Sequence, residues 1–138
     1  LFNKIQIRPG ASIWAWQKDD KIILCLPGTP GAVLVDFFLF AAPAIKKLQG
    51  NLVCLPQTLS LPLSEAYSKK HVMREMRNGR LLYREGKLWA KEERSQSQSR
   101  FALKAGCNLL IDIPAGPESL AKGDLVQVYL IRKAGKLN

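Results

Sequence analysis

The residues of this chain best suited to bind an anion lie in a short turn, Pro27-Gly28-Thr29-Pro30. Proline and glycine end the apolar run before the turn, while threonine and proline are typical of a helix N-cap and a first helical residue. We expect the Thr29 hydroxyl to cap that helix. The N–H groups of the first helical turn and the positive end of the helix dipole then point at the same spot. The turn predicts an anion site made from backbone, although an ordinary strand-to-helix connection has the same pattern.

Two segments must hold this turn in place. Residues 21–26 are almost entirely apolar and include β-branched side chains, which predicts a buried β-strand. Residues 30–48 carry apolar side chains at helical spacing, so we expect a helix there that Pro43 kinks without ending. Gly50 suits the position just after the helix. Asp36 is expected on the outer, solvated face of this helix.

The rest of the chain has a β-like pattern. Before the turn, residues 2–7 and 13–17 predict two short strands, and residues 18–20 predict a hairpin turn after them. After the helix, short β-like runs alternate with turn signals; these runs are residues 52–55, 58–63, 71–77, 80–83, 87–92, 109–113 and 125–131. Many short strands with regular turns indicate a small barrel or sandwich. The expected fold class is therefore α/β followed by all-β, with a boundary near residues 50–55.

Two details of this β-rich part are specific enough to test. Asn78-Gly79 separates two of the runs and predicts a turn between them. Within the run at residues 109–113, strict alternation predicts that the odd-numbered residues face the core. Leu110 and Asp112 are then expected to face outward.

Composition limits the class of protein. The chain has 138 residues with a hydrophobic fraction of 47%, which fits one globular domain or two small ones and argues against disorder. No apolar run reaches the ~18 residues that a membrane-spanning helix needs. The three cysteines form no CxxC pair and there is one histidine, so we expect buried free thiols in a reducing compartment and no zinc site.

The net charge of +10 favours an anionic partner without identifying it. The most concentrated basic cluster consists of Lys69, Lys70, His71, Arg74, Arg77 and Arg80. Such a cluster is a candidate nucleic-acid surface. Charged residues on a strand face are more often simply solvated, so nucleic-acid binding is the weaker interpretation.

Several motifs in this order resemble one family. They are Lys-Ile-Gln-Ile-Arg-Pro-Gly at residues 4–10, Leu-Pro-Gly-Thr-Pro at 26–30, Phe-Phe-Leu-Phe at 37–40, Pro-Ala-Ile-Lys-Lys-Leu-Gln-Gly at 43–50, and the segments 107–114 and 122–128. Their order and spacing are similar to those of the molybdopterin molybdenumtransferases of molybdenum cofactor biosynthesis, known as MoeA in bacteria and as the gephyrin E domain in animals. The resemblance covers nearly the whole chain but only the second half of a family member.

The resemblance implies a fold, an activity and partners. Residues 1–51 would be the C-terminal part of a three-layer α/β molybdopterin-binding domain, and residues 52–138 the C-terminal β-barrel, the family's domain IV. The full enzyme would be a cytoplasmic homodimer, neither membrane-bound nor nucleic-acid-binding, that inserts molybdate into adenylylated molybdopterin with Mg²⁺ and releases AMP. The family's acidic metal and molybdate ligands lie before Leu1, and no paired carboxylates replace them here. We therefore expect the fragment alone to be inactive.

Substrate-binding residues also follow from the resemblance. They are Lys4, Arg8, Pro27, Gly28, Thr29, Pro30, Arg77 and Ser97. Lys4 and Arg8 match two basic residues of the family, and a spacing of four on an extended strand would place both on one face. Thr29 stands where the family has asparagine. Arg77, with Arg74 as the fallback, matches a barrel arginine.

The serine of this set lies in an altered loop. The family's Gln-Gly-Ser aligns with Gln96-Ser97-Gln98, so its serine falls on Gln98, which is flanked by Ser97 and Ser99. Ser97 is the candidate. Because several family motifs are altered, a non-catalytic scaffold of the same fold is the alternative function. A basic nucleic-acid-binding barrel is a third and weaker one.

Overall fold

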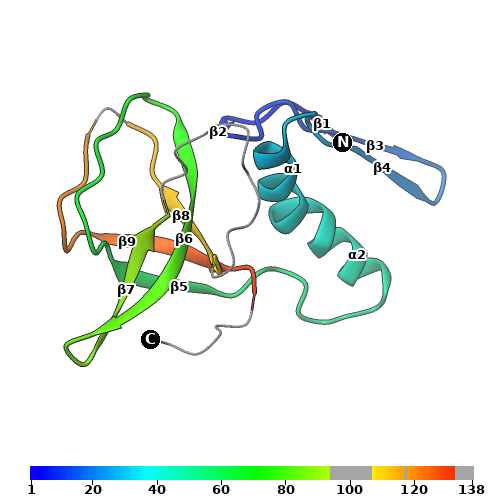
Figure 1. Ribbon diagram of the computed structural model, residues 1–138. Coiled ribbons are helices and arrows are strands. Elements are labelled where there is room, and N and C mark those ends of the chain that lie inside the picture. The colour runs from blue at the N-terminus through cyan, green and yellow to red at the C-terminus, as the bar shows by residue number, and fades with distance from the viewer. Residues whose placement is uncertain (94–106, 117, 133–138) are drawn as a thin grey trace. The chain divides into compact units, whose positions relative to one another are not determined.

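The computed structural model describes residues 1–93, 107–116 and 118–132 (Figure 1). The chain divides into two compact units, Leu1–Pro56 and Gln57–Asn138. Most of the regular structure is β-strand, and the first unit contributes one helix. None of the helical segments in the described part of the chain is long and apolar enough to cross a membrane.

The first unit contains a small antiparallel sheet in the order β1-β3-β4. Its strands are β1 (Phe2–Asn3), β3 (Trp14–Lys18) and β4 (Lys21–Cys25), and a further short strand, β2 (Ile7–Arg8), follows β1. The predicted hairpin between β3 and β4 is confirmed, with Lys18 paired to Lys21 and a positive φ at Asp19.

The predicted strand over residues 2–7 is confirmed only at its two ends, in β1 and β2, because the backbone leaves the extended conformation at Lys4. Lys4 has a φ of 57°, and its N–H donates to the carbonyl of Ile13 at 2.9 Å. The N–H of Ile5 donates to the carbonyl of Ala11 at 3.0 Å. These bonds draw the segment into a loop, so Lys4 and Arg8 do not share one face of a continuous strand.

The prediction that β4 is buried is also wrong. Ile22 and Ile23 are 42% and 45% exposed, and consecutive strand residues point to opposite faces, so both faces of β4 are open. The neighbouring strand β3 likewise exposes Trp14 and Trp16, whose ring centroids lie 5.3 Å apart. The apolar run therefore marks a surface that the described residues leave largely uncovered.

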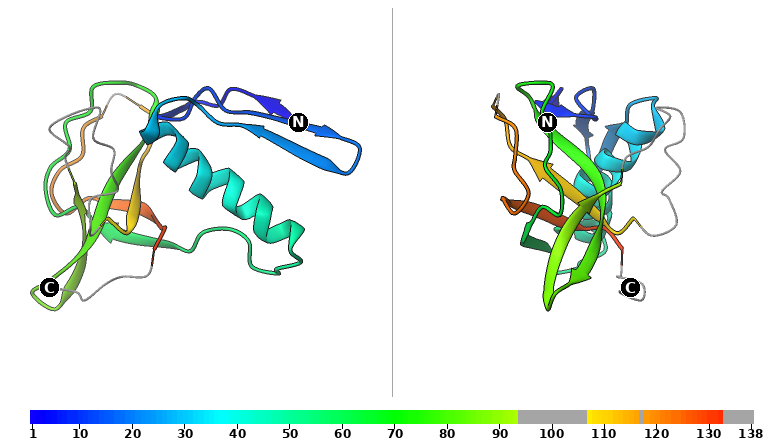
Figure 2. Two further views of the ribbon diagram at one scale, coloured as in Figure 1. Left: turned by 45° about the vertical axis from the view of Figure 1, so that its right-hand side comes forward. Right: turned by 60° about the vertical axis from the view of Figure 1, so that its left-hand side comes forward.

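One helix runs through residues 30–48, as predicted, and its ribbon continues without a break in Figure 2. It consists of α1 (Pro30–Asp36), a π-helical turn η1 (Phe37–Ala41) and α2 (Ala42–Leu48). Within the wide turn, the N–H of Ala42 donates to the carbonyl of Phe37, five residues back. Pro43 has no N–H, and its ring crowds the carbonyl four residues earlier, which accounts for a wider turn at this point.

The two ends of the helix differ in how well the sequence predicts them. The N–H of Gly50 donates to the carbonyl of Lys47 and that of Asn51 to the carbonyl of Lys46, both at 3.0 Å. Together with the φ of 79° at Gly50, these bonds form a Schellman motif, as the glycine predicts. At the other end, the Thr29 side chain makes no capping hydrogen bond, so that prediction is wrong.

The second unit is an antiparallel sheet in the order β7-β6-β8-β9-β5. Its strands are β5 (Thr58–Pro62), β6 (Arg74–Arg84), β7 (Lys87–Glu92), β8 (Leu109–Ile113) and β9 (Leu125–Leu130). The two ends of this order approach each other, because Leu63, just after β5, forms a bridge with Ala90 in β7. The run at residues 52–55, in contrast, forms no strand.

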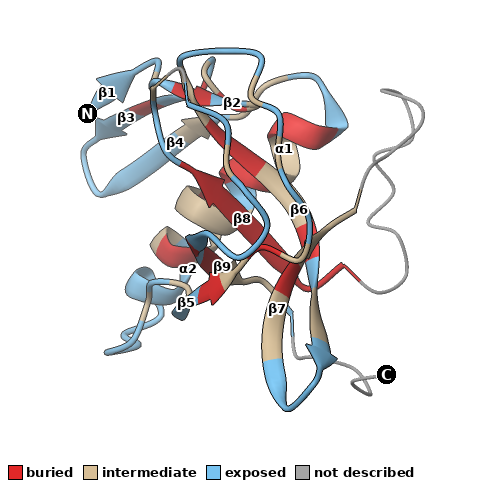
Figure 3. Cartoon of the chain, turned by 90° about the vertical axis from the view of Figure 1, so that its left-hand side faces the viewer, coloured by how far each residue is buried: buried red, intermediate tan, exposed pale blue. Residues whose placement is uncertain are grey.

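The core of the second unit lies on one face of this sheet. Its buried residues are Leu61, Leu63, Ala90, Leu109, Ile111, Ile113, Val126 and Val128. The odd-numbered residues of β8 face this core, as predicted. Leu110 and Asp112 were expected to be outside, but both are buried and β8 is buried along its whole length (Figure 3). Alternation alone cannot predict burial for a central strand that is covered on both faces.

The turn predicted at Asn78-Gly79 is absent, since β6 runs straight through it. A Cβ on Gly79 would lie 2.6 Å from Cδ1 of Ile111 and 2.7 Å from the backbone oxygen of Lys91. A glycine is therefore required at position 79 because the neighbouring strands pack too closely for a side chain, and not because the chain turns.

Candidate functional site

The Pro27–Pro30 turn connects β4 to α1. Thr29 has extended backbone angles, and its carbonyl accepts the N–H of Val33 at 3.0 Å, which is the first hydrogen bond of the helix. Gly28, Thr29 and Pro30 are exposed, and a Cβ on Gly28 would meet nothing within 4 Å. The turn itself is therefore open to solvent, whereas Gly31 and Ala32, whose N–H groups belong to the first helical turn, are buried. Its use as an anion site stays a prediction.

Lys4 and Arg8 are both exposed, but they lie on different local structures. Lys4 is in the loop after β1, whereas Arg8 is in β2. Both charges are thus accessible to solvent. The two side chains do not share one strand face, which their spacing had led us to expect. Their substrate-binding role is not tested by this geometry.

Asp36 contradicts its predicted position on a solvated helix face. The residue is completely buried, and neither carboxyl oxygen has a hydrogen-bond partner among the described residues. Burial raises the pKa of Asp36 to about 7. Helical periodicity could not predict this, because the π-helical turn and the packing against Gly10 are not visible in the spacing of apolar residues.

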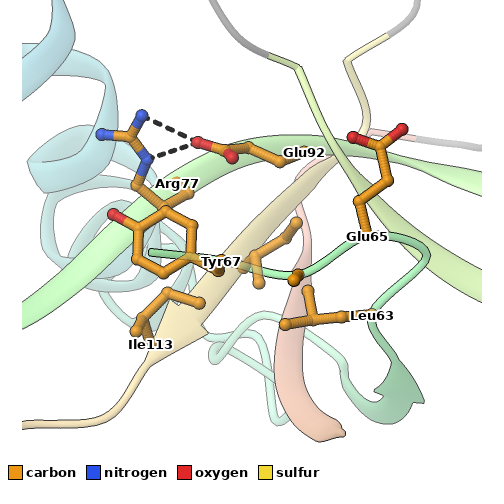
Figure 4. A pocket seen from close by; sticks show the side chains of 8 residues that line it. Leu63, Glu65, Tyr67, Arg77, Glu92 and Ile113 are labelled. Atoms are coloured by element: carbon orange, nitrogen blue, oxygen red, sulfur yellow. Dashed lines mark hydrogen bonds and ion pairs between the residues drawn. The ribbon is translucent and has the colours of Figure 1, made fainter. Parts of the chain in front are cut away.

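Arg77 lies at a small pocket in the second unit (Figure 4). The pocket is lined by Leu63, Glu65, Ala66, Tyr67, Arg77, Glu92, Ile111 and Ile113. Nε and Nη2 of Arg77 both lie 2.8 Å from Oε1 of Glu92. The guanidinium carbon of Arg77 is 5.7 Å from the centre of the Tyr67 ring, a distance at which a cation–π interaction forms.

Strand register explains why these side chains meet. Gly79 in β6 pairs with Glu92 in β7, and Arg77 is two residues before Gly79 on the same face. Arg77 and Glu92 are therefore diagonal neighbours. Because Gly79 has no side chain, the long side chain of Arg77 has room to reach the carboxylate.

A second hydrogen bond lies beside this ion pair. The Tyr67 hydroxyl donates to Oε2 of Glu75, a buried residue whose Oε1 has no partner among the described residues. Burial, followed by the hydrogen bond to Glu75, raises the pKa of Tyr67 to about 12. Burial works to lower the pKa of Arg77, but the hydrogen bond to Glu92 and the nearby acidic groups outweigh it and raise that pKa. The tyrosine is therefore neutral and the arginine charged at physiological pH.

Arg74, the fallback to Arg77, faces the other side of the sheet, because an odd spacing along a strand reverses the side chain's direction. Its Nε donates to Oδ1 of the buried Asp112 at 2.7 Å, and its Nη2 also bonds to Oδ2. The Tyr129 hydroxyl lies 3.3 Å from the same Nη2. The hydrogen bond to Asp112 raises the pKa of Arg74 above its ordinary value. Arg74 is thus engaged in a structural pair.

The basic cluster is less available to nucleic acid than its sequence suggests. Arg74, Arg77 and Arg80 each pair with a carboxylate, and the Arg80 pair joins its Nε to Oε1 of Glu93 at 2.8 Å. Pairing of this kind reduces the positive potential that attracts phosphates.

Three further predictions concern single residue types. Ser97 lies outside the described residues. In the part of the chain that the structure describes, no group of three or more His, Cys, Asp or Glu side chains could hold a metal ion. Cys25, Cys54 and Cys107 form no disulfide with one another, but only Cys107 is buried, so the predicted burial is wrong for the other two.

Comparison with known proteins identifies the family. The family model for the MoeA C-terminal region (domain IV) matches residues 60–131, slightly more than half of the chain. The chain belongs to the MoeA family. The resemblance seen in the sequence motifs is thereby confirmed. The second unit contains the segment that the family model matches.

Relatives extend the match beyond that segment. The chain is similar to the molybdopterin molybdenumtransferase of Staphylococcus epidermidis, with 31% identity over 131 residues, which is 94% of this chain and 31% of the relative. It is 29% identical over 133 residues to the enzyme of that name from Bacillus subtilis, covering 96% of this chain and 31% of the relative. The chain therefore spans about a third of the length of these relatives.

Solved MoeA structures share the fold. A molybdopterin biosynthesis MoeA protein from Pyrococcus horikoshii superposes with a TM-score of 0.73 at 23% identity, over 94% of this chain and 31% of that one. A molybdenum cofactor biosynthesis protein from Pyrococcus furiosus gives 0.66 at 26% identity, over 94% and 45%. The order of elements described above is thus a MoeA arrangement.

Proposed function

We propose that this chain is the C-terminal part of a molybdopterin molybdenumtransferase, which inserts molybdate into adenylylated molybdopterin during molybdenum cofactor biosynthesis and releases AMP. One observation carries the proposal: relatives with this name match 94% of the chain, so the similarity covers both compact units. The scaffold and nucleic-acid alternatives are not favoured, since the relatives reported above carry the name of the enzyme and the arginines of the basic cluster are paired.

In this proposal the first unit completes a three-layer α/β molybdopterin-binding domain together with preceding chain. The exposed apolar side chains of β3 and β4 support it, because Trp14, Trp16, Ile22 and Ile23 would be covered by the missing layer. The second unit is the family's small barrel, and the bridge between Leu63 and Ala90 supports closure of its sheet.

The substrate's phosphate groups would be held by Lys4, Arg8 and the Pro27–Pro30 turn of the first unit. Lys4 and Arg8 offer exposed positive charge, and Gly28, Thr29 and Pro30 of the turn are exposed. Arg77 would add a guanidinium from the second unit, and Ser97 would contribute a hydroxyl. Such groups position an anion and stabilise its charge, which is what this chain supplies to the reaction.

The described residues do not fit a Mg²⁺ site, since they include no suitable cluster of acidic side chains. We therefore assign the metal and molybdate ligands to another part of the enzyme and derive no step through them. Homodimer formation and a reducing, cytoplasmic location belong to the same proposal. The fragment alone is expected to bind without catalysing the reaction.

The binding role is tested by calorimetry with molybdopterin, using full-length protein that carries Lys4→Ala and Arg8→Ala together. We expect at least a roughly tenfold loss of affinity, as for removal of two charge-assisted hydrogen bonds. Lys46→Ala with Lys47→Ala is the matched control, since it removes the same charge from the exposed far end of the helix in the same unit. Equal affinities of the two double variants would rule out a specific role for Lys4 and Arg8.

A further inference from the structure

Arg77 already has an anionic partner inside the second unit. Its guanidinium presents two nitrogens to one carboxylate oxygen of Glu92, each at 2.8 Å. The two side chains differ in access to solvent, with 40% of the Arg77 side chain exposed but only 12% of that of Glu92. A ligand can therefore reach the arginine, while the carboxylate that neutralises it is largely enclosed.

The pair is held in place by regular structure on both sides. Arg77 is in β6 and Glu92 is in the paired strand β7, so neither backbone can shift easily. The Tyr67 ring lies against the guanidinium, and its hydroxyl is fixed by the bond to Glu75. Figure 4 shows the guanidinium and the Glu92 carboxylate facing each other beside the Tyr67 ring. Any rearrangement is therefore confined to side-chain rotation.

The charges around Arg77 disfavour a second anion. Glu92 is in contact with the guanidinium, Glu65 lines the same pocket, and Glu75 lies on the same strand face two residues from Arg77. At partly buried positions, like charges a few ångströms apart repel strongly. An anion that approaches Arg77 must overcome this repulsion unless the Glu92 carboxylate moves away.

We propose that Glu92 is an internal competitor for Arg77, so that a phosphate-bearing ligand binds there only by displacing the Glu92 carboxylate. This inference rests on the proposed anion-binding role of Arg77. It adds a specificity determinant: a dianionic phosphate or diphosphate competes with one carboxylate better than a monoanion does, because it offers more charge and more acceptor oxygens. Glu92 then excludes weak anions from the site.

The experiment measures pyrophosphate binding to the full-length protein by calorimetry at constant ionic strength. Glu92→Gln keeps an acceptor oxygen for Arg77 but removes the negative charge, and we expect it to tighten binding by roughly fivefold. Adding Arg77→Ala to this variant should abolish the gain. Glu93→Gln is the matched control, because Glu93 pairs with Arg80 at the same 2.8 Å, and it should leave the affinity unchanged.

Each outcome bears on a different claim. Equal affinities for wild type and Glu92→Gln, with a clear loss in Arg77→Ala, would overturn the competition while leaving Arg77 as an anion ligand. A gain that persists without Arg77, or that Glu93→Gln reproduces, would also overturn it, since general charge would then explain the effect. If Arg77→Ala binds pyrophosphate as tightly as wild type does, Arg77 is not an anion ligand. If Glu92→Gln does not fold, Glu92→Asp, which shortens the carboxylate arm, must give the same direction of change.

Discussion

The carboxyl group of Asp36 fills the space that a side chain on Gly10 would need. A Cβ built on Gly10 would lie 3.0 Å from Cγ of Asp36 and closer still to Oδ1. Gly10 also has a φ of +113°, a conformation that other residues rarely adopt. This contact joins the turn after β2 to the helix, and it involves a completely buried acid.

Gly10→Ala should therefore destabilise the protein. The new methyl group collides with Asp36 and forces a strained φ, so we expect the free energy of unfolding to fall by roughly 2–4 kcal/mol. Denaturant unfolding measures the change. Gly28→Ala is the control, because a Cβ there meets nothing within 4 Å, and it should cost less than about 1 kcal/mol. Equal decreases in the free energy of unfolding for both variants would show that the contact with Asp36 does not account for the effect.

Burial of Asp36 predicts an unusual pH dependence. Its pKa is raised to about 7 in the folded protein, so between pH 4 and 7 the folded state binds more protons than the unfolded state. The contribution of Asp36 to the free energy of unfolding is therefore greatest at low pH. It decreases by up to about 4 kcal/mol as the pH rises from about 4 through 7. The advantage of Asp36→Asn over wild type should grow from pH 5 to pH 8 in denaturant titrations. A difference that stays constant over this range would contradict an unpaired, buried carboxyl group.

Arg74 should stabilise the protein, because it pairs with the buried carboxylate of Asp112. Arg74→Ala leaves the Asp112 carboxylate buried with its main cation removed, and we expect a loss of roughly 3 kcal/mol. Arg84→Ala is the control, because Arg84 and Glu85 form an exposed pair at 3.4 Å, and it should change stability by less than about 1 kcal/mol. Thermal or denaturant unfolding at pH 7 compares them. A mild effect at Arg74 would mean that Tyr129 and solvent satisfy Asp112 without it.

Local sequence signals predicted much of the secondary structure. The helix over residues 30–48 and its glycine end were confirmed, as were the strands Lys87–Glu92 and Leu109–Ile113 with their boundaries. Propensity, helical spacing and glycine chemistry act within a few residues, so one sequence suffices to read them. The family followed from a different signal, the order and spacing of motifs along nearly the whole chain.

The features that sequence did not predict depend on contacts distant in the chain. The partner of Arg77 is 15 residues away, and that of Arg74 is 38 residues away. Gly79 is conformationally ordinary and is required by Ile111 on another strand, which no local pattern reveals. The exposure of β4 has a related cause, because an apolar run predicts that a strand is covered without identifying what covers it.

The central claim is that this chain is the binding portion of a molybdenum insertase. The most direct test adds molybdate and Mg²⁺ to adenylylated molybdopterin bound to full-length protein and measures AMP release, with the 138-residue chain assayed in parallel. We predict that the full-length protein releases AMP in step with molybdenum insertion and that the 138-residue chain releases none. Full-length protein that binds the substrate but releases no AMP would contradict the enzymatic assignment.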